Sequence, residues 1–473
     1  MTIIARLGLI FLVTSVAALA QDSRPAVKSV VERIIKEELA NGRAYEMLGE
    51  LCRIAPARLA GTENSEKAVQ WAKAALEKAG ADVVRLERCL VPCWKRGDIA
   101  ECVVVEPKEL AGEKLPILAL GGSVATPEGG ITAEVIEAPT FEKLRAIGEG
   151  AKGKIVLFNE PMDRSLPTTF EAYGRAGRIR GRGAIEAARV GAVAALTRSL
   201  TTLIDDQPHT GAMNYDDTLP KLPAAAISTR AAERLAALLL EGKKVVVRFR
   251  IDCKTLPDVE GFNVVADLLG RESPDEIVLV GGHLDSWDVN QGAHDDGAGC
   301  VQSIETLRLL KAMDLRPRRT LRVVLFANEE NGLRGALAYL EAHRAELGKH
   351  VAAIETDSGG FTPRGFSTDS PGDGLARLRG LAAHLEALGA DRVTPGGGGA
   401  DIGVLVEGGV PLIGLRPDSS RYFDFHHAPR DNFDGVNERE LESGAAAVAA
   451  LAWLIAEEKE PLPRNPVRER RRR

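Results

Sequence analysis

A short apolar run leads directly into a loop of glycine, histidine and aspartate, and this junction leaves few folds open to the chain. Ile277 to Val280 is bounded by turn-forming residues, which is typical of a buried strand. Two glycines follow, and then come His283 and Asp285. Side chains two positions apart on an extended backbone leave on the same side, so the pattern predicts a histidine with a carboxylate beside it. Asp285 is then suited to orient the imidazole if the histidine binds a metal.

The same loop continues into a second polar cluster. Gly292-Ala293 is expected to form a tight turn that presents His294, Asp295 and Asp296. The small residues 297–299 follow, and they let the backbone approach whatever the carboxylates hold. An exposed acidic loop is the alternative for either cluster alone, but two clusters directly after one strand favour a binding site.

Strand and helix patterns alternate regularly from this point onward. The expected strands are 320–326, 351–354 and 410–415, and the expected helices are 298–313, 374–388 and 438–457. This alternation predicts an α/β fold with a mostly parallel or mixed sheet that is covered by helices on both faces.

The preceding part of the chain predicts a second unit. A chain of 473 residues is long enough for two or three domains. Short strand patterns separated by Gly and Pro predict an inserted α/β domain at 119–253, so that 21–118 and 254–460 form one discontinuous catalytic domain. No catalytic cluster is evident in the insertion, where His209 is interpreted as structural or as part of the rim. Residues 461–473 are interpreted as a basic disordered tail.

The polar residues after the strands predict one catalytic crevice, because ligands of open parallel sheets bind at the carboxyl ends of the strands. The candidate side chains are His283, Asp295, Glu329, Glu330, Asp357 and His427. So many carboxylates in one cleft would repel one another, so two divalent cations are expected, and the mixed nitrogen and oxygen ligands suit zinc. One of two adjacent glutamates can bind metal while the other accepts a proton from an attacking water, which is chemistry suited to amide hydrolysis.

Composition and the first residues bear on the compartment. The net charge of −6 gives no reason to expect nucleic-acid binding. Arg6, an apolar run and a small-x-small site at Ala18 to Ala20 predict a signal peptide at 1–20, and hence a secreted or periplasmic protein rather than a membrane anchor. No later segment is apolar enough to span a membrane. The six cysteines are interpreted as buried thiols or as one or two disulfides.

Several segments resemble those of a known family. GGHLDSWDVNQGAHDDGAG, ANEENGLRGA, ETDSG and FHHAPRD resemble the metal-binding segments of the co-catalytic zinc exopeptidase family. GGSVATPEGGITAEV, KGKIVLFN, GAVAALTRS and HTGAMNYDDTLPKLPAAAIS resemble the protease-associated domain that a group of its members carries as an insertion. The resemblance covers nearly the whole chain between the predicted signal and the basic tail.

The resemblance implies two zinc sites that share one carboxylate. One zinc would be held by His283, Asp295 and Asp357, and the other by Asp295, Glu330 and His427. His427 is preferred to His426 because the family's ligand stands four residues before an acid, which is Asp431 in this chain.

The resemblance also assigns roles around the metals. Glu329 would be the general base, and Asp285 would orient His283. The peptide bond between Asp295 and Asp296 is expected to be cis. His294 departs from the pattern, because an apolar residue is usual at its position, and it could be mistaken for a ligand.

The implied function is a dizinc carboxypeptidase or dipeptidase that cleaves short peptides with unblocked termini, with an aminopeptidase as the alternative. An inactive receptor-like binding protein and a single-zinc acyl transferase would lack ligands that this chain keeps. Gly396–Gly399, Arg421 and Tyr422 are expected to recognise a terminal carboxylate, unless Arg421 pairs with Asp418 or Asp424. The expected partner is a short peptide, nucleic acid is not expected, and a homodimer is left open.

Overall fold

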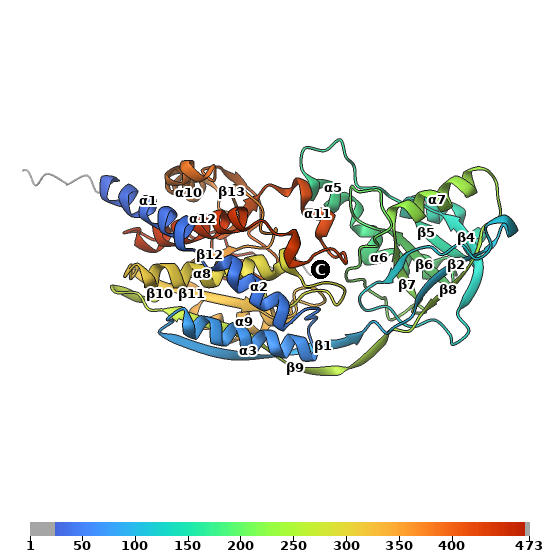
Figure 1. Cartoon of the computed structure of the whole chain (residues 1–473), viewed down its shortest axis with the longest axis horizontal. Helices are drawn as coiled ribbons and strands as arrows, with labels where there is room; N and C mark the ends of the chain where they lie inside the picture. Colours follow the sequence, from blue (N-terminus) through green and yellow to red (C-terminus); the bar gives the residue numbers. More distant parts are fainter. Residues whose placement is uncertain (1–23, 469–473) are drawn as a thin grey trace, which may run out of the picture.

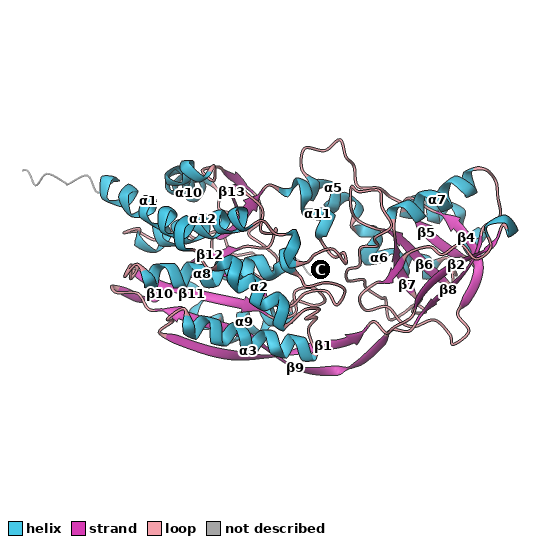
Figure 2. Ribbon diagram, in the orientation of Figure 1, coloured by secondary structure: helices cyan, strands magenta, loops and turns pink. Residues whose placement is uncertain are grey.

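The computed structural model describes residues 24–468, which form two lobes (Figures 1 and 2). The strands of the larger lobe are β1 (Val83–Lys95), β9 (Lys254–Leu268), β10 (Ser273–His283), β11 (Arg319–Phe326), β12 (His350–Glu355), β13 (Pro363–Thr368), β14 (Val393–Pro395) and β15 (Leu412–Pro417). Its helices are α1 (Arg24–Asn41), α2 (Ala44–Ile54), α3 (Glu63–Lys78), α8 (Ala298–Ala312), α9 (Arg334–Ala342), α10 (Gly372–Ala382), α11 (Tyr422–Phe425) and α12 (Glu438–Glu457).

The larger lobe is an eight-stranded mixed sheet in the order β1-β9-β11-β10-β12-β15-β13-β14. Alternate side chains of its strands enter different cores. Val278 and Val280 pack with α1, α2, α3, α8, α10 and α12, whereas Ile277 and Leu279 pack on the other face with α9. Helices therefore cover both faces, and the expected α/β class is confirmed.

The smaller lobe is a seven-stranded sheet. Its strands are β2 (Ala100–Glu106), β3 (Ile117–Ala119), β4 (Ile131–Glu137), β5 (Ile155–Phe158), β6 (Ala194–Arg198), β7 (Ala224–Ile227) and β8 (Val246–Ile251), and its helices are α4 (Phe141–Ile147), α5 (Thr169–Ala176), α6 (Arg178–Arg189) and α7 (Thr229–Leu240). The strand order is β2-β8-β4-β5-β6-β7-β3. Leu157 and Leu196 pack with α7 on one face, and Val156 and Ala195 pack with α4, α5 and α6 on the other.

A long antiparallel ribbon connects the lobes. β1 and β9 pair from Val83 opposite Asp267 to Lys95 opposite Lys254, and they run along one side of the molecule (Figure 1). β2 follows β1 and already belongs to the second sheet, so this lobe begins before residue 119, where the insertion was expected to start. β9 was not predicted because Pro257 interrupts its pattern. The ribbon tolerates this proline because β9 pairs with β11 only from residue 264 onward.

Aromatic contacts hold the lobes against each other on the opposite side of the cleft. Phe170 of α5 stacks on Tyr422 of α11 with the ring centroids 5.3 Å apart, and Tyr173 stacks on Phe423 at 4.6 Å. These contacts fix α5 beside the segment that carries His426 and His427, so the smaller lobe becomes one wall of the site.

Two predictions concern the ends of the chain, a signal peptide at the N-terminus and a disordered tail at the C-terminus. The predicted signal at 1–20 lies outside the described residues. The predicted disordered tail begins with ordered contacts, because Leu462 is buried and Asn465 donates its backbone N–H to the carbonyl of Gly409. Arg464 reaches the carbonyls of Leu347 and His350.

All six cysteines are buried free thiols, so of the two interpretations the thiols are correct and the disulfides are wrong. Between residues 24 and 468, none of the helices has the length and apolar character needed to cross a membrane.

Candidate metal centre

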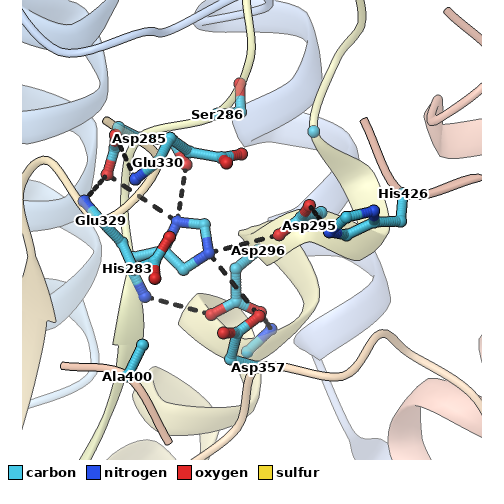
Figure 3. A network of polar contacts seen from close by, with 12 residues as sticks. His283, Asp285, Ser286, Asp295, Asp296, Glu329, Glu330, Asp357, Ala400 and His426 are labelled. Carbon is cyan, nitrogen blue, oxygen red and sulfur yellow. Dashed lines mark hydrogen bonds and ion pairs between the residues drawn. The ribbon is translucent and has the colours of Figure 1, made fainter. Parts of the chain in front are cut away.

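The carboxyl ends of three adjacent parallel strands deliver the polar residues to one place. His283 is the last residue of β10, which lies between β11 and β12 in the sheet. Glu329 and Glu330 follow β11, and Asp357 stands two residues beyond β12. Figure 3 shows His283 in contact with Asp285 and Asp295 of the loop after β10 and with Asp357 of the loop after β12.

Asp295 lies between two histidines. Its Oδ1 is 3.3 Å from Nε2 of His283, and its Oδ2 is 3.3 Å from Nε2 of His427. Each histidine also faces a second acid, because Nε2 of His283 is 3.6 Å from Asp357 and Nε2 of His427 is 3.1 Å from Glu330. The chain thus forms two His-plus-carboxylate groups that share one aspartate.

His426 is close to this arrangement but contacts less of it. Its ring stacks on that of His427 with centroids 3.5 Å apart, and its Nε2 is 3.8 Å from Oδ2 of Asp295. His427 reaches both Asp295 and Glu330 at shorter distances, which favours the predicted choice of His427 as the ligand.

The carboxylate of Asp431 fixes the backbone around Asp295. The segment Ala293–Gly297 is a wide helical turn that begins after Gly292, whose φ of 58° lies in the left-handed region. Asp431 accepts the backbone N–H groups of His294 at 2.7 Å and Asp295 at 3.1 Å. The peptide bond that follows Asp295 is cis, as expected.

Asp285 contacts both the two glutamates and His283. Its carboxylate accepts the backbone N–H of Glu329 at 3.0 Å and that of Glu330 at 3.4 Å. The ring Nδ1 of His283 is 3.0 Å from the backbone carbonyl of Asp285 and 3.8 Å from its carboxylate. The carboxylate therefore positions the two glutamates, and both its backbone carbonyl and its carboxylate face Nδ1 of His283.

The electrostatics of the site call for a cation. Burial raises the pKa of Glu330 well above its usual value, and the charge of Asp295 adds to this shift. Oδ2 of Asp295 and Oε1 of Glu330 are buried and accept no hydrogen bond from any described residue. The carboxylates therefore meet in the interior with too few donors, which is costly without a compensating positive charge.

His427 is a neutral histidine at the centre of this site. Burial and the adjacent His426 lower the pKa of His427 well below its usual value, so the ring is neutral. Its Nδ1 lies 3.3 Å from the carbonyl of Thr210 and 3.2 Å from Nη1 of Arg180, and the tautomer with the proton on Nδ1 would leave a lone pair on Nε2 for a metal. Neutral imidazole nitrogen and carboxylate oxygen are the donor set that zinc accepts, so these residues fit a divalent metal.

The site opens into a cavity of about 810 Å³ between the lobes. The smaller lobe contributes Tyr173 and Arg180, and the larger lobe contributes the run 397–399 and Arg416. Arg421 does not line this cavity. Arg421 was predicted either to recognise a substrate carboxylate or to pair with Asp418 or Asp424. Both predictions were wrong, because the side chain forms an ion pair with Glu440 at 2.9 Å.

Two other histidines have structural contacts. His294 stacks on Phe361 with the ring centroids 4.2 Å apart, and its Nδ1 accepts the backbone N–H of Gly360 at 3.2 Å. Burial lowers the pKa of His294 to about 4. His209 points its Nδ1 at the carbonyl of His426, 2.8 Å away, so it supports the segment that carries His427.

Sequence reasoning missed three residues that shape the site. Arg58, in the loop between α2 and α3, is fully buried and donates to the carbonyls of Leu284 and Gly292 in the motif loop. Arg180 of the smaller lobe lies 3.2 Å from Nδ1 of His427. Glu355 lines the cavity. Only Glu355 carried a visible signal, because it stands at the end of a predicted strand two residues before Asp357.

A mixed α/β sheet that brings two histidines and several carboxylates together in a cleft defines the chain as a metallopeptidase. Residues 263–452 match the sequence profile of Peptidase family M28. Carboxypeptidase Q of Mus musculus is 39% identical over 451 residues, which are 92% of this chain and 93% of that protein. The chain therefore belongs to peptidase family M28.

Solved structures agree with this assignment. The crystal structure of a Peptidase M28 precursor from Shewanella amazonensis SB2B matches with a TM-score of 0.89 at 35% identity, covering 93% of this chain and 99% of that one. A zinc aminopeptidase from Bacillus subtilis matches with a TM-score of 0.62 at 21% identity, covering 90% and 98%, and so shares the fold.

Proposed function

We propose that this chain is an exported two-zinc exopeptidase that hydrolyses dipeptides and other short peptides with free termini. The observation that carries the proposal is the position of Asp295, whose two oxygens each lie 3.3 Å from a different histidine. A carboxylate placed in this way can bridge two metals, whereas a single-metal site does not need the second histidine.

The ligand assignment follows the two groups around Asp295. His283 and Asp357 would complete one zinc site, and Glu330 and His427 would complete the other. When bound, zinc supplies Lewis acidity toward the scissile carbonyl and the attacking water. The identity of the metal as zinc is supported by the ligand types and by the zinc aminopeptidase that shares the fold.

Glu329 is assigned to proton transfer. Both glutamates belong to the cavity lining, and the carboxylate of Glu330 lies against His427. Asp285 holds both backbone amides, so the two glutamates keep different directions. Glu329 would take a proton from the attacking water and return it to the leaving amine.

The carboxypeptidase or dipeptidase form is supported by cations in the cavity. Arg180 and Arg416 line it, and Nε of Arg180 is buried without a hydrogen-bond partner among the described residues. A substrate carboxylate would satisfy that donor. The aminopeptidase alternative is supported by Glu355, which lines the same cavity and could face a substrate ammonium group.

Two measurements test the proposal. Elemental analysis of protein purified without chelator is expected to give about two zinc ions per chain, and full activity at a stoichiometry near one would contradict the paired site. The second measurement is kcat/KM for one dipeptide in free, C-amidated and N-acetylated forms. Amidation is expected to cost far more than acetylation, and the reverse order would identify an aminopeptidase.

Export is tested separately. The pattern at 1–20 predicts cleavage before Gln21, so N-terminal sequencing of protein recovered from outside the cytoplasm is expected to begin at that residue. Recovery of the protein with Met1 intact would contradict export by this signal.

A further inference from the structure

Three buried glutamates meet on helices that carry none of the proposed zinc ligands. Glu38 lies on α1, Glu305 on α8 and Glu442 on α12, and these three helices pack side by side (Figure 1). One oxygen from each carboxylate lies within 4.8 Å of the others. The exposed fractions are 1% for Glu38, 0% for Glu305 and 7% for Glu442.

The oxygens of this cluster are only partly satisfied. Glu305 accepts from Arg308 and from the backbone N–H of Arg43, and Oε1 of Glu442 accepts the backbone N–H of Tyr45 at 2.8 Å. Both oxygens of Glu38 and Oε2 of Glu442 are buried without a hydrogen-bond partner among the described residues. Three buried oxygens of the cluster therefore have no N–H donor among the described residues.

The charges do not balance either. Three carboxylates face one guanidinium, that of Arg308, whose Nη2 lies 4.0 Å from Glu38. Burial and the neighbouring acids raise the pKa of Glu38 to about 12. One proton on Glu38 could donate a single hydrogen bond, which would leave at least one of the three acceptor atoms without a partner.

The surrounding backbone closes tightly over the cluster. A methyl group on Gly42 would lie 2.5 Å from Oε2 of Glu442 and 2.9 Å from Oε1 of Glu38, so this position needs glycine. The amides that bind Glu305 and Glu442 come from the residues that lead into and begin α2, and such donors favour the ionised form of a carboxylate.

We propose that Glu38, Glu305 and Glu442 bind a structural divalent cation of the oxygen-preferring class, such as Ca²⁺, Mg²⁺ or Mn²⁺. An all-carboxylate set suits these ions, and an ion that displaced the proton of Glu38 would offset with its charge of two the excess of two negative charges left by three ionised carboxylates and one guanidinium. The ion fastens the first described helix, α1, to the long buried helix α12 and to α8, which leads from the Asp295 turn.

The test uses the zinc-loaded enzyme and its Glu38→Gln variant. Ca²⁺, Mg²⁺ and Mn²⁺ are titrated one at a time, with binding followed by calorimetry and stability followed by thermal unfolding. At least one of these ions is expected to bind with a stoichiometry of one and to raise the Tm of the wild type by a few degrees. Glu38→Gln is expected to lose both effects while keeping its zinc content and its kcat/KM on a dipeptide.

A matched control and a direct observation keep the test decisive. Glu32→Gln, at an exposed position of the same helix, is expected to respond like the wild type. Crystals grown with Mn²⁺ are expected to show an anomalous peak among the three carboxylates, a result that needs no variant. Equal responses of wild type and Glu38→Gln to all three cations, together with the lack of a peak, would show that the cluster holds protons and would overturn the proposal.

Discussion

Replacement of Arg58 by methionine tests whether a distant loop holds the motif loop in place. Arg58 lies between α2 and α3, is fully buried, and donates from Nε to Leu284 O at 2.6 Å and from Nη2 to Gly292 O at 2.9 Å. A third bond reaches the carbonyl of Gln291. The guanidinium thus connects both ends of the loop between β10 and the Asp295 turn, and methionine preserves most of the volume but none of the donors.

The magnitude follows from these three bonds. Hydrogen bonds to a charged donor contribute about 1.5–3 kcal/mol each, so the gross loss is roughly 5–9 kcal/mol. Methionine also avoids the desolvation of a buried charge, which returns several kcal/mol. The free energy of unfolding is therefore expected to fall by about 2–5 kcal/mol. Zinc affinity is expected to fall by about 10–100-fold, as it does when residues that orient metal ligands are removed.

The assay compares Arg58→Met with Arg53→Met, because Arg53 is an exposed residue of α2. Urea unfolding gives the change in stability, and competition with a chelator gives the change in zinc affinity. The control is expected to match the wild type within about 0.5 kcal/mol. If Arg58→Met loses less than about 1 kcal/mol and binds zinc normally, the three bonds do not position the loop and the reasoning is refuted.

Three further predictions concern the site itself. Glu329→Gln is expected to keep its zinc and lose about 10²–10⁴-fold in kcat, because an amide cannot accept the proton, whereas Glu330→Gln is expected to lose zinc; an active Glu329→Gln enzyme would reverse the assignment. Gly299→Ala is expected to destabilise the fold by about 3 kcal/mol or more in urea unfolding, because its methyl group would lie 1.7 Å from the carbonyl of Thr356; a wild-type midpoint would contradict this. In the metal-free protein, burial and Asp357 raise the pKa of Glu355 from 4.5 to about 7. The folded state then keeps a proton that the unfolded chain releases, so the contribution of Glu355 to stability, measured as the difference between wild type and Glu355→Gln, is expected to fall by roughly 3 kcal/mol from about pH 4.5 to about pH 7, and a rise in that difference would contradict the shift.

Several features of the fold could be predicted from local patterns. The strand that ends at His283 and the helix 438–457 were recognised because apolar periodicity is a property of neighbouring residues. β9 was missed because proline and glycine interrupt its pattern, and its pairing with β1 involves residues far away in the chain.

The candidate ligands were also local, because each stands just after a strand or in a motif loop. Their convergence could be expected from the rule that parallel strands end at the same edge of a sheet. The sequence did not indicate that the Asp285 carboxylate holds the glutamate loop, nor that Arg421 turns away from the cavity toward Glu440. A long side chain such as that of Arg421 could pair with any of several acidic residues with a similar free energy. Only the distances in the folded protein determine which of them it contacts.

The sequence by itself thus determined the residue types and the order in which strands present them. The tertiary structure alone decided which distant residues complete the site. Arg58 is 226 residues away from Leu284 in the chain, and Arg180 is 247 residues away from His427, yet both pairs are in contact. Contacts of this kind depend on how the lobes and loops pack, and packing is set by the sum of many buried surfaces rather than by any local pattern.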